Sequence, residues 1–174
     1  VFVGTGSYSA FEEHLYDIGG DIATAGHTVV CTGANVGLTG ALVKGMLAGK
    51  GQVVGIIHTS LYEIEGVVEG VDPELATDVF HEHDKIRTEG EVLIFMPGGV
   101  DTLAALFHTL LLIETGVLHK HVYVYNIGQW LGPALEQLAY ATKLGFCDIK
   151  KLLITQHDFK LILEEIGLLE APAV

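Results

Sequence analysis

Short runs of apolar residues alternate along the chain with segments in which apolar residues recur every three or four positions. The apolar runs cover residues 1–3, 28–31, 53–57, 92–96, 122–125 and 152–154. Uninterrupted apolar runs of this length are typical of strands buried on both faces of a parallel sheet. The periodic segments predict helices over residues 8–25, 42–49, 81–90, 102–114, 131–144 and 158–166. This alternation predicts a doubly wound, Rossmann-like α/β fold with helices on both faces of one parallel sheet.

Two segments fit this alternation less well. Residues 59–73 are polar, acidic and poorly periodic, so we expect a long loop at the edge of the site. Residues 77–80 are expected to form a short strand. No linker, internal repeat or low-complexity segment interrupts the pattern, which predicts that residues 1–174 form a single domain.

Glycine-rich turns follow three of the predicted strands. Their candidate ligand-binding residues are Gly6 and Ser7, then Gly33, Asn35 and Gly37, then Pro97, Gly98, Gly99, Asp101 and Thr102. A tight turn from a strand into a helix aims backbone N–H groups and the positive end of the helix at one point, which suits an anion. We therefore expect the second and third turns to converge on one receptor for a small phosphorylated metabolite, assisted by the hydroxyls of Ser7 and Thr102.

Charge and composition exclude several classes of partner. The net charge is −13 with only nine basic residues, so we expect no nucleic-acid polymer and no anionic membrane surface as a partner. The mean hydropathy is +0.44, but no apolar run approaches the roughly 18–20 residues that span a bilayer. No signal peptide is visible, so we expect a cytoplasmic protein. Cys31 and Cys147 match no metal-binding spacing and are expected to be reduced thiols in or near the core.

The predicted helix over 102–114 is apolar nearly all round, with Leu103, Leu106, Phe107 and Leu111 at positions on different faces. Such a helix must be covered on every side. Because the sheet covers only one side, we expect a second copy of the chain to cover the other. This predicts a homo-oligomer, a dimer or a tetramer, that forms through residues 102–114.

Four short motifs occur in the order that one family shows. The stretch GANVGLTGA at 33–41 is similar to the family pattern GGGxxGLMGA, and PGGVDT at 97–102 resembles PGGxGT. LIETGVLHK at 112–120 resembles QLGIHxKP, and Gly145-Phe146 matches the GF after the penultimate helix of the family. The chain thus resembles the Lonely Guy (LOG) family, often labelled lysine decarboxylase-like. The resemblance implies a dimeric Rossmann-type protein related to cytokinin riboside 5′-monophosphate phosphoribohydrolases, which release a free base and ribose 5-phosphate.

The chain departs from the family pattern at the positions where the chemistry is expected. The family reads PGGxGTxxE, whereas this chain has Asp101 in place of a glycine and Ala105 in place of the glutamate. The family motif MHERK corresponds to residues 80–84, which puts His83 at the arginine position; Arg87, one helical turn later, is a possible substitute. A carboxylate stabilises the cation-like sugar of glycosidic cleavage, and an arginine holds a phosphate bidentately. His83 and Arg87 are therefore the remaining catalytic candidates. Losing a catalytic group such as the family's glutamate or arginine typically lowers the rate by a factor on the order of 10²–10⁴.

Asp101 allows two interpretations. Its carboxylate repels a phosphate if it points into the turn, or it caps the following helix through the N–H groups of Leu103 or Ala104. We expect the cap.

Other polar residues are expected to have structural roles. His81, His83 and Asp84, with Glu82, are candidates for metal ligands, but the expectation is a solvated helix end and no metal. His108 is expected at a subunit interface rather than as a catalytic base. The acidic residues of the loop, Glu63, Glu65 and Glu69, are expected to be solvated, with a replacement catalytic carboxylate as the alternative.

Three functions remain open. The first is a binder of a nucleotide or phosphorylated small molecule that is a weak or inactive phosphoribohydrolase. The second, which the resemblance implies, is a carrier of molybdenum cofactor, with that pterin phosphate as cargo. The third is an active hydrolase with relocated residues, Arg87 and a loop glutamate. Lysine decarboxylation is disfavoured because no lysine lies in a motif suited to holding pyridoxal phosphate.

Overall fold

The computed structural model of the chain describes residues 1–6 and 8–170. The strands are β1 (Thr28–Cys31), β2 (Gln52–His58), β3 (Pro73–Ala76), β4 (Leu93–Phe95), β5 (Val122–Tyr125) and β6 (Ile154–Gln156). The helices are α1 (Ser9–Thr24), α2 (Gly37–Ala48), α3 (Thr59–Glu65), α4 (Val79–Glu89), α5 (Val100–Glu114), α6 (Gly132–Lys143), α7 (Ile149–Leu152) and α8 (Phe159–Glu170), with a 3-10 turn η1 (Ile127–Gln129). Within the described part of the chain, no helix is both long enough and apolar enough to cross a membrane.

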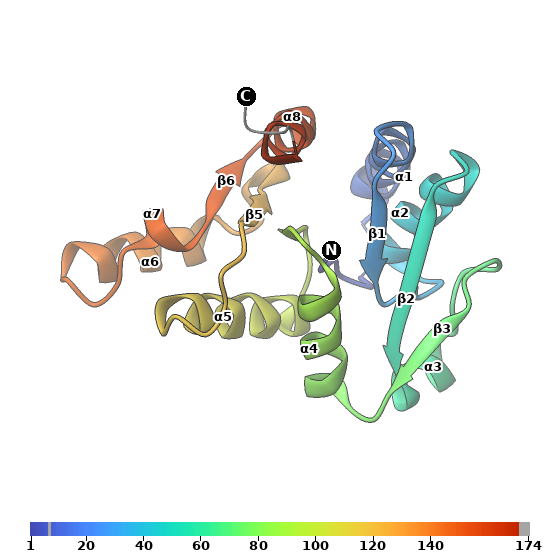
Figure 1. The fold of residues 1–174 in the computed structure, drawn as a ribbon, viewed down its shortest axis with the longest axis horizontal. Coiled ribbons are helices and arrows are strands. Elements are labelled where there is room, and N and C mark those ends of the chain that lie inside the picture. The colour runs from blue at the N-terminus through green and yellow to red at the C-terminus, as the bar shows by residue number, and fades with distance from the viewer. Residues whose placement is uncertain (7, 171–174) are drawn as a thin grey trace.

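The strands form two parallel three-stranded sheets, in the orders β1-β2-β3 and β4-β5-β6 (Figure 1). Residues 1–3 lie between β1 and β4 and connect the two sheets. Phe2 N donates to Ile94 O at 2.8 Å, Met96 N donates to Phe2 O at 2.9 Å, and the amino group of Val1 donates to Val30 O. The predicted strand at 1–3 is thus a single parallel bridge between Phe2 and Phe95.

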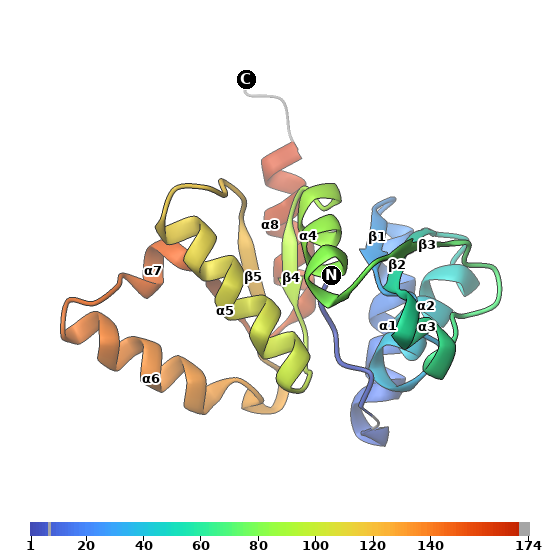
Figure 2. The ribbon, with the colours of Figure 1, turned by 90° about the horizontal axis from the view of Figure 1, so that it is seen from below.

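The two sheets, joined through Phe2, carry one apolar core on each side. On one face, β1, β4 and β5 pack with α1, α2 and α8 through residues such as Leu15, Leu42 and Ile162. On the other face, α4 and α5 supply Ile86 and Leu106. Figure 2 shows α5 and α8 on opposite sides of β4 and β5. This arrangement confirms the predicted doubly wound α/β fold.

Three predicted segments are wrong in detail. The expected loop at 59–73 contains the helix α3, which has no buried residue and therefore no apolar periodicity for a sequence pattern to detect. The expected strand at 77–80 instead leads into α4: Asp78 is the N-cap of the helix, and its side chain accepts hydrogen bonds from Phe80 N and His81 N, both at 2.9 Å. The strand expected at 152–154 is displaced to β6, because the buried apolar run begins while the chain is still in α7.

Candidate functional site

The glycine turns meet at the carboxyl ends of the central strands. The turn after β1 leads into α2, the turn after β4 leads into α5, and residues 4–6 run between the two turns. Gly4 N donates to Pro97 O at 2.9 Å, and Thr39 N donates to Gly4 O at 3.2 Å. The structure therefore brings the two predicted turns together, with a strip of backbone between them.

The turn before α2 binds the chain itself. Leu38 N donates to Gly6 O at 3.2 Å, beside the bond from Thr39 N to Gly4 O. At Gly37, which has φ +51°, an added Cβ would lie 2.0 Å from Thr5 O. These two helix-start amides are thus occupied by carbonyl groups, which corrects the expectation that the amides of both turns converge on a ligand.

The backbone groups of Gly33 and Asn35 in the turn before α2 also form hydrogen bonds within the chain. Gly33 O accepts from Val68 N at 3.0 Å, and Asn35 N donates to Gly66 O at 3.4 Å. These bonds attach the turn before α2 to the segment after α3. The Ser7 candidate lies outside the described residues.

In the turn before α5, the first backbone N–H groups of the helix are not occupied by a described side chain. Gly99 is the N-cap of α5, and no described side chain caps this end of the helix. Thr102 is buried and folds back over Gly98, where an added Cβ would lie 2.0 Å from its Oγ1. The N–H groups of Val100 and Asp101 belong to the first turn, where no intrahelical acceptor exists. Such a helix N-terminus, with free N–H groups and the positive end of the helix dipole, suits an anion.

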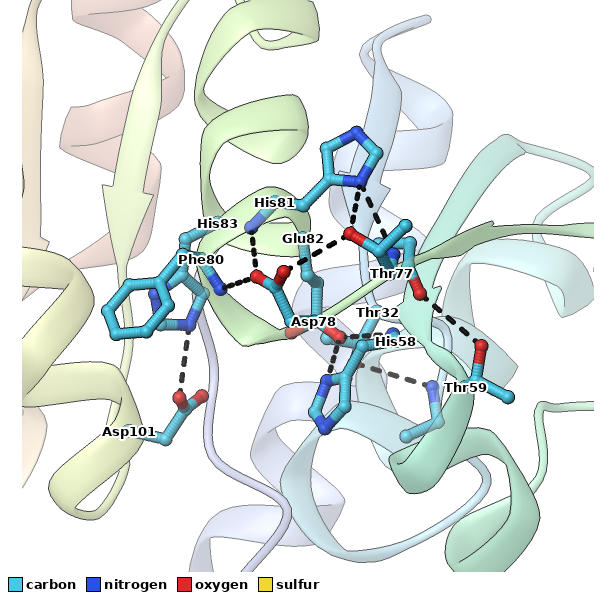
Figure 3. Close-up of polar contacts among 12 residues, drawn as sticks. Thr32, His58, Thr59, Thr77, Asp78, Phe80, His81, Glu82, His83 and Asp101 are labelled. Atoms are coloured by element: carbon cyan, nitrogen blue, oxygen red, sulfur yellow. Dashed lines mark hydrogen bonds and ion pairs between the residues drawn. The ribbon is translucent and has the colours of Figure 1, made fainter.

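Asp101 joins α5 to α4 (Figure 3). Its Oδ1 lies 3.0 Å from His83 Nε2, and its side chain is 65% exposed while that of His83 is 7% exposed. The predicted helix cap is wrong because α5 begins two residues earlier than Thr102, so Asp101 lies inside the first turn with Gly99 at the cap position. Asp101 and Ala105 are four residues apart and share one face of α5. The carboxylate thus stands one helical turn before the position at which the family pattern has glutamate.

Glu82 is buried beneath this pair. Its Oε2 accepts hydrogen bonds from His58 N at 2.6 Å and from His58 Nδ1 at 2.7 Å. Burial raises the pKa of the Glu82 carboxyl group above its usual value, and the hydrogen bonds from His58 oppose that shift. Sequence reasoning did not select His58; the available signal was its position at the end of β2, where the carboxyl ends of parallel strands meet.

Arg87 lies deeper between α4 and α5 than a phosphate-binding residue would. Its Nε donates to Thr109 Oγ1 at 3.1 Å, its Nη2 lies 3.3 Å from His108 Nδ1, and its Nη1 is 3.6 Å from Asp84 Oδ1. The side chain is 2% exposed, and burial lowers the pKa of the Arg87 guanidinium group while Asp84 opposes that shift. Arg87 therefore binds the middle of α5, one helical turn from His83.

The N-terminal half of α4 is only partly solvated, whereas the sequence predicts that all of its polar side chains face solvent. His81 is exposed and accepts from Thr77, and Asp84 is exposed. Glu82 and His83 instead point inward and lie with Asp101, so that one ligand atom of each lies within 4.8 Å of the others.

The acidic residues after β2 are not all solvated. Glu63 and Glu69 are exposed, as expected. Glu65 Oε2 is buried and has no hydrogen-bond partner among the described residues. Glu65 precedes Gly66, which accepts from Asn35 N, so the backbone of Glu65 is near the turn before α2.

Comparisons with known proteins agree with this architecture. The cytokinin riboside 5′-monophosphate phosphoribohydrolase LOG of Oryza sativa subsp. japonica is 26% identical over 166 residues, which are 92% of this chain and 69% of that protein. The solved molybdenum cofactor binding protein of Rippkaea orientalis has a TM-score of 0.68 at 18% identity, over 98% of this chain and 95% of the other. The molybdenum cofactor carrier protein of Chlamydomonas reinhardtii has a TM-score of 0.65 at 19% identity, over 95% and 91%.

The sequence match to the family extends over most of the fold. The family described as "Possible lysine decarboxylase" matches residues 39–165, from the first turn of α2 into α8. This range includes the turn before α5 and the whole of α4, which together supply the site. The chain belongs to this family, the LOG or lysine decarboxylase-like family.

Proposed function

We propose that the chain binds a nucleotide or another phosphorylated small molecule at the N-terminus of α5. The observation that carries the proposal is the turn at Pro97, Gly98 and Gly99, which leaves the first amides of α5 without backbone acceptors in the described residues. Unpaired helix-start amides and the helix dipole favour a phosphate group. The turn before α2 supports this element from the other side of residues 4–6.

The same site supports weak or absent phosphoribohydrolase activity. Ala105 is fully buried in the apolar core and offers no carboxylate, and His83 stands at the arginine position of the family. Arg87 is held by Thr109 and His108, so it does not replace that arginine in this arrangement. An active hydrolase would need its carboxylate from Asp101, Glu82 or Glu65 instead.

Titration calorimetry with AMP and with adenosine tests the binding proposal. We expect AMP to bind at least about tenfold more tightly than adenosine, because the amides of α5 recognise the phosphate. Incubation with AMP and with isopentenyladenosine monophosphate, followed by chromatography for free base, tests the chemistry. Equal binding of AMP and adenosine would contradict the phosphate site, and rapid release of base would show that relocated residues supply the catalysis.

A molybdenum cofactor carrier is the second candidate. Two molybdenum cofactor proteins share the fold over nearly the whole chain, and a carrier needs no carboxylate at the glycosidic bond. The cargo would present its phosphate to the same helix terminus. Competition between molybdenum cofactor and AMP distinguishes the two proposals, since a carrier retains the cofactor when AMP is in excess.

We also propose that the chain self-associates through α5. Val100, Phe107 and Leu111 are 84%, 43% and 53% exposed on one apolar side of this helix. Replacing Leu111 by glutamate is expected to convert an oligomer into a monomer, because a charge would be buried without a partner. Light scattering after size exclusion measures the mass; Ile64→Glu, at an exposed apolar position on α3, is the control that leaves the mass unchanged. A monomeric wild-type chain would refute the proposal.

A further inference from the structure

We propose that Glu82, His83 and Asp101 bind one divalent transition-metal ion, for which Zn²⁺ is the probe. The site lies between the first turns of α4 and α5 (Figure 3). The sequence predicts no metal at this place, because no third ligand near α4 is evident from the sequence alone. The fold supplies that ligand from α5. The inference is independent of the proposed phosphate ligand, because it concerns side chains that meet in the chain alone.

The spacing of the three groups fits a metal ion. One ligand atom from each residue lies within 4.8 Å of the others, and His83 Nε2 is 3.0 Å from Asp101 Oδ1. Ligand atoms about 2.1 Å from a tetrahedral zinc ion are about 3.4 Å apart, so small side-chain movements suffice. A recess of about 10 Å³ opens beside these side chains and Thr102. One imidazole and two carboxylates are a donor set suited to Zn²⁺, with a fourth position left open.

The buried imidazole of His83 has one close polar neighbour at Nε2, the Asp101 carboxylate, but no hydrogen bond there within the described residues. The residue is only 5% exposed, and its Nε2 lies 3.0 Å from Asp101 Oδ1. The ring is fixed edge-on to Phe2, with ring centres 5.7 Å apart and an interplanar angle of 82°. A buried, unpaired nitrogen is costly, whereas a neutral imidazole with its proton on Nδ1 directs the Nε2 lone pair at a metal. Nε2 lies beside the Asp101 carboxylate, and a ligand atom of Glu82 is within 4.8 Å of those of His83 and Asp101.

The surroundings orient the ligands and favour a cation. His58 holds Glu82 through Oε2, and no hydrogen bond from a described residue reaches the other oxygen, Oε1. Such outer contacts fix the direction of a ligating carboxylate. Glu82 and Asp101 place two carboxyl groups beside one imidazole, in a chain with a net charge of −13. A divalent ion would compensate the charge of the two carboxylates.

Calorimetric titration of the chelator-treated full chain with Zn²⁺ tests the inference. We expect one ion per chain, and His83→Gln and Asp101→Asn to weaken binding by about 100-fold or more through loss of a ligand. Asp101 is exposed, so Asp101→Asn keeps the fold, which circular dichroism checks. Cobalt substitution gives a visible absorption band that should disappear in both variants.

His81→Gln is the matched control. His81 lies on the same helix turn as the proposed ligands but is exposed and bonded to Thr77. Its replacement should leave zinc binding unchanged. The inference fails if the wild-type chain binds no zinc, if His83→Gln binds it as tightly as wild type, or if His81→Gln weakens binding as much as His83→Gln does.

Discussion

Replacing Gly19 by alanine is expected to destabilise the fold by about 3 kcal/mol. An added Cβ at this position would lie 2.2 Å from Leu42 O and 2.7 Å from Met46 N, so α1 and α2 would have to separate. Backbone atoms cannot yield as a side-chain tip does, and overpacking of this kind typically costs about 1–3 kcal/mol or more. For a chain of this length, that loss lowers the melting temperature by roughly 6–12 °C.

The neighbouring residue gives the matched control. Gly20 occupies the same helix, but no described heavy atom lies within 4 Å of a Cβ added there. Gly20→Ala should therefore stabilise the chain by about 0.5–1 kcal/mol, because alanine loses less conformational entropy in a helix than glycine does. Thermal unfolding followed by circular dichroism measures both variants. Equal effects of the two substitutions would contradict the close approach of α1 and α2.

The sequence was sufficient for the elements that local pattern controls. The apolar run before Pro97 and the helix after Gly99 predicted β4 and α5, because hydrophobic periodicity and turn glycines are local signals. The sequence also predicted that the turn between β4 and α5 lies beside the turn before α2, since parallel strands of a doubly wound sheet end at one edge.

The side-chain partners in the site could not be predicted in the same way. Asp101 suits a helix cap by its residue type, yet one shift in the start of α5 places it inside the helix, facing His83. The bond between His58 and Glu82 joins two segments that no motif connects. Such partners depend on how α4 packs against the strand ends, which residue spacing does not specify. The contacts of Arg87 with Thr109 and His108 depend on the same packing, so the sequence could not predict them either.

The sequence also could not predict that backbone carbonyl groups accept from the first amides of α2. A glycine turn before a helix looks the same whether its amides face a ligand or another strip of backbone. Here residues 4–6 come from the start of the chain and fill that position, so that Gly4 O and Gly6 O accept from α2. These bonds occupy two amides of the turn before α2, which supports the proposal that the phosphate binds at α5.

Replacing Asp101 by asparagine is expected to raise the affinity for AMP about tenfold in metal-free buffer. A carboxylate about 5 Å from a phosphate repels it by roughly 3 kcal/mol at an effective dielectric constant near 20. Because the Asp101 side chain is 65% exposed, solvent and salt screen part of this repulsion, and about 1.4 kcal/mol is the expected remainder.

Calorimetric titration with AMP in the presence of a chelator measures the change, and the gain should shrink as salt is added. Glu89→Gln makes the same change of charge at the other end of α4 and should leave the affinity unaltered. A similar gain in Glu89→Gln would attribute the effect to the overall charge of −13. An unchanged affinity in Asp101→Asn would mean that the phosphate does not bind beside the first turn of α5, and the assignment of the anion site to that helix would then be wrong.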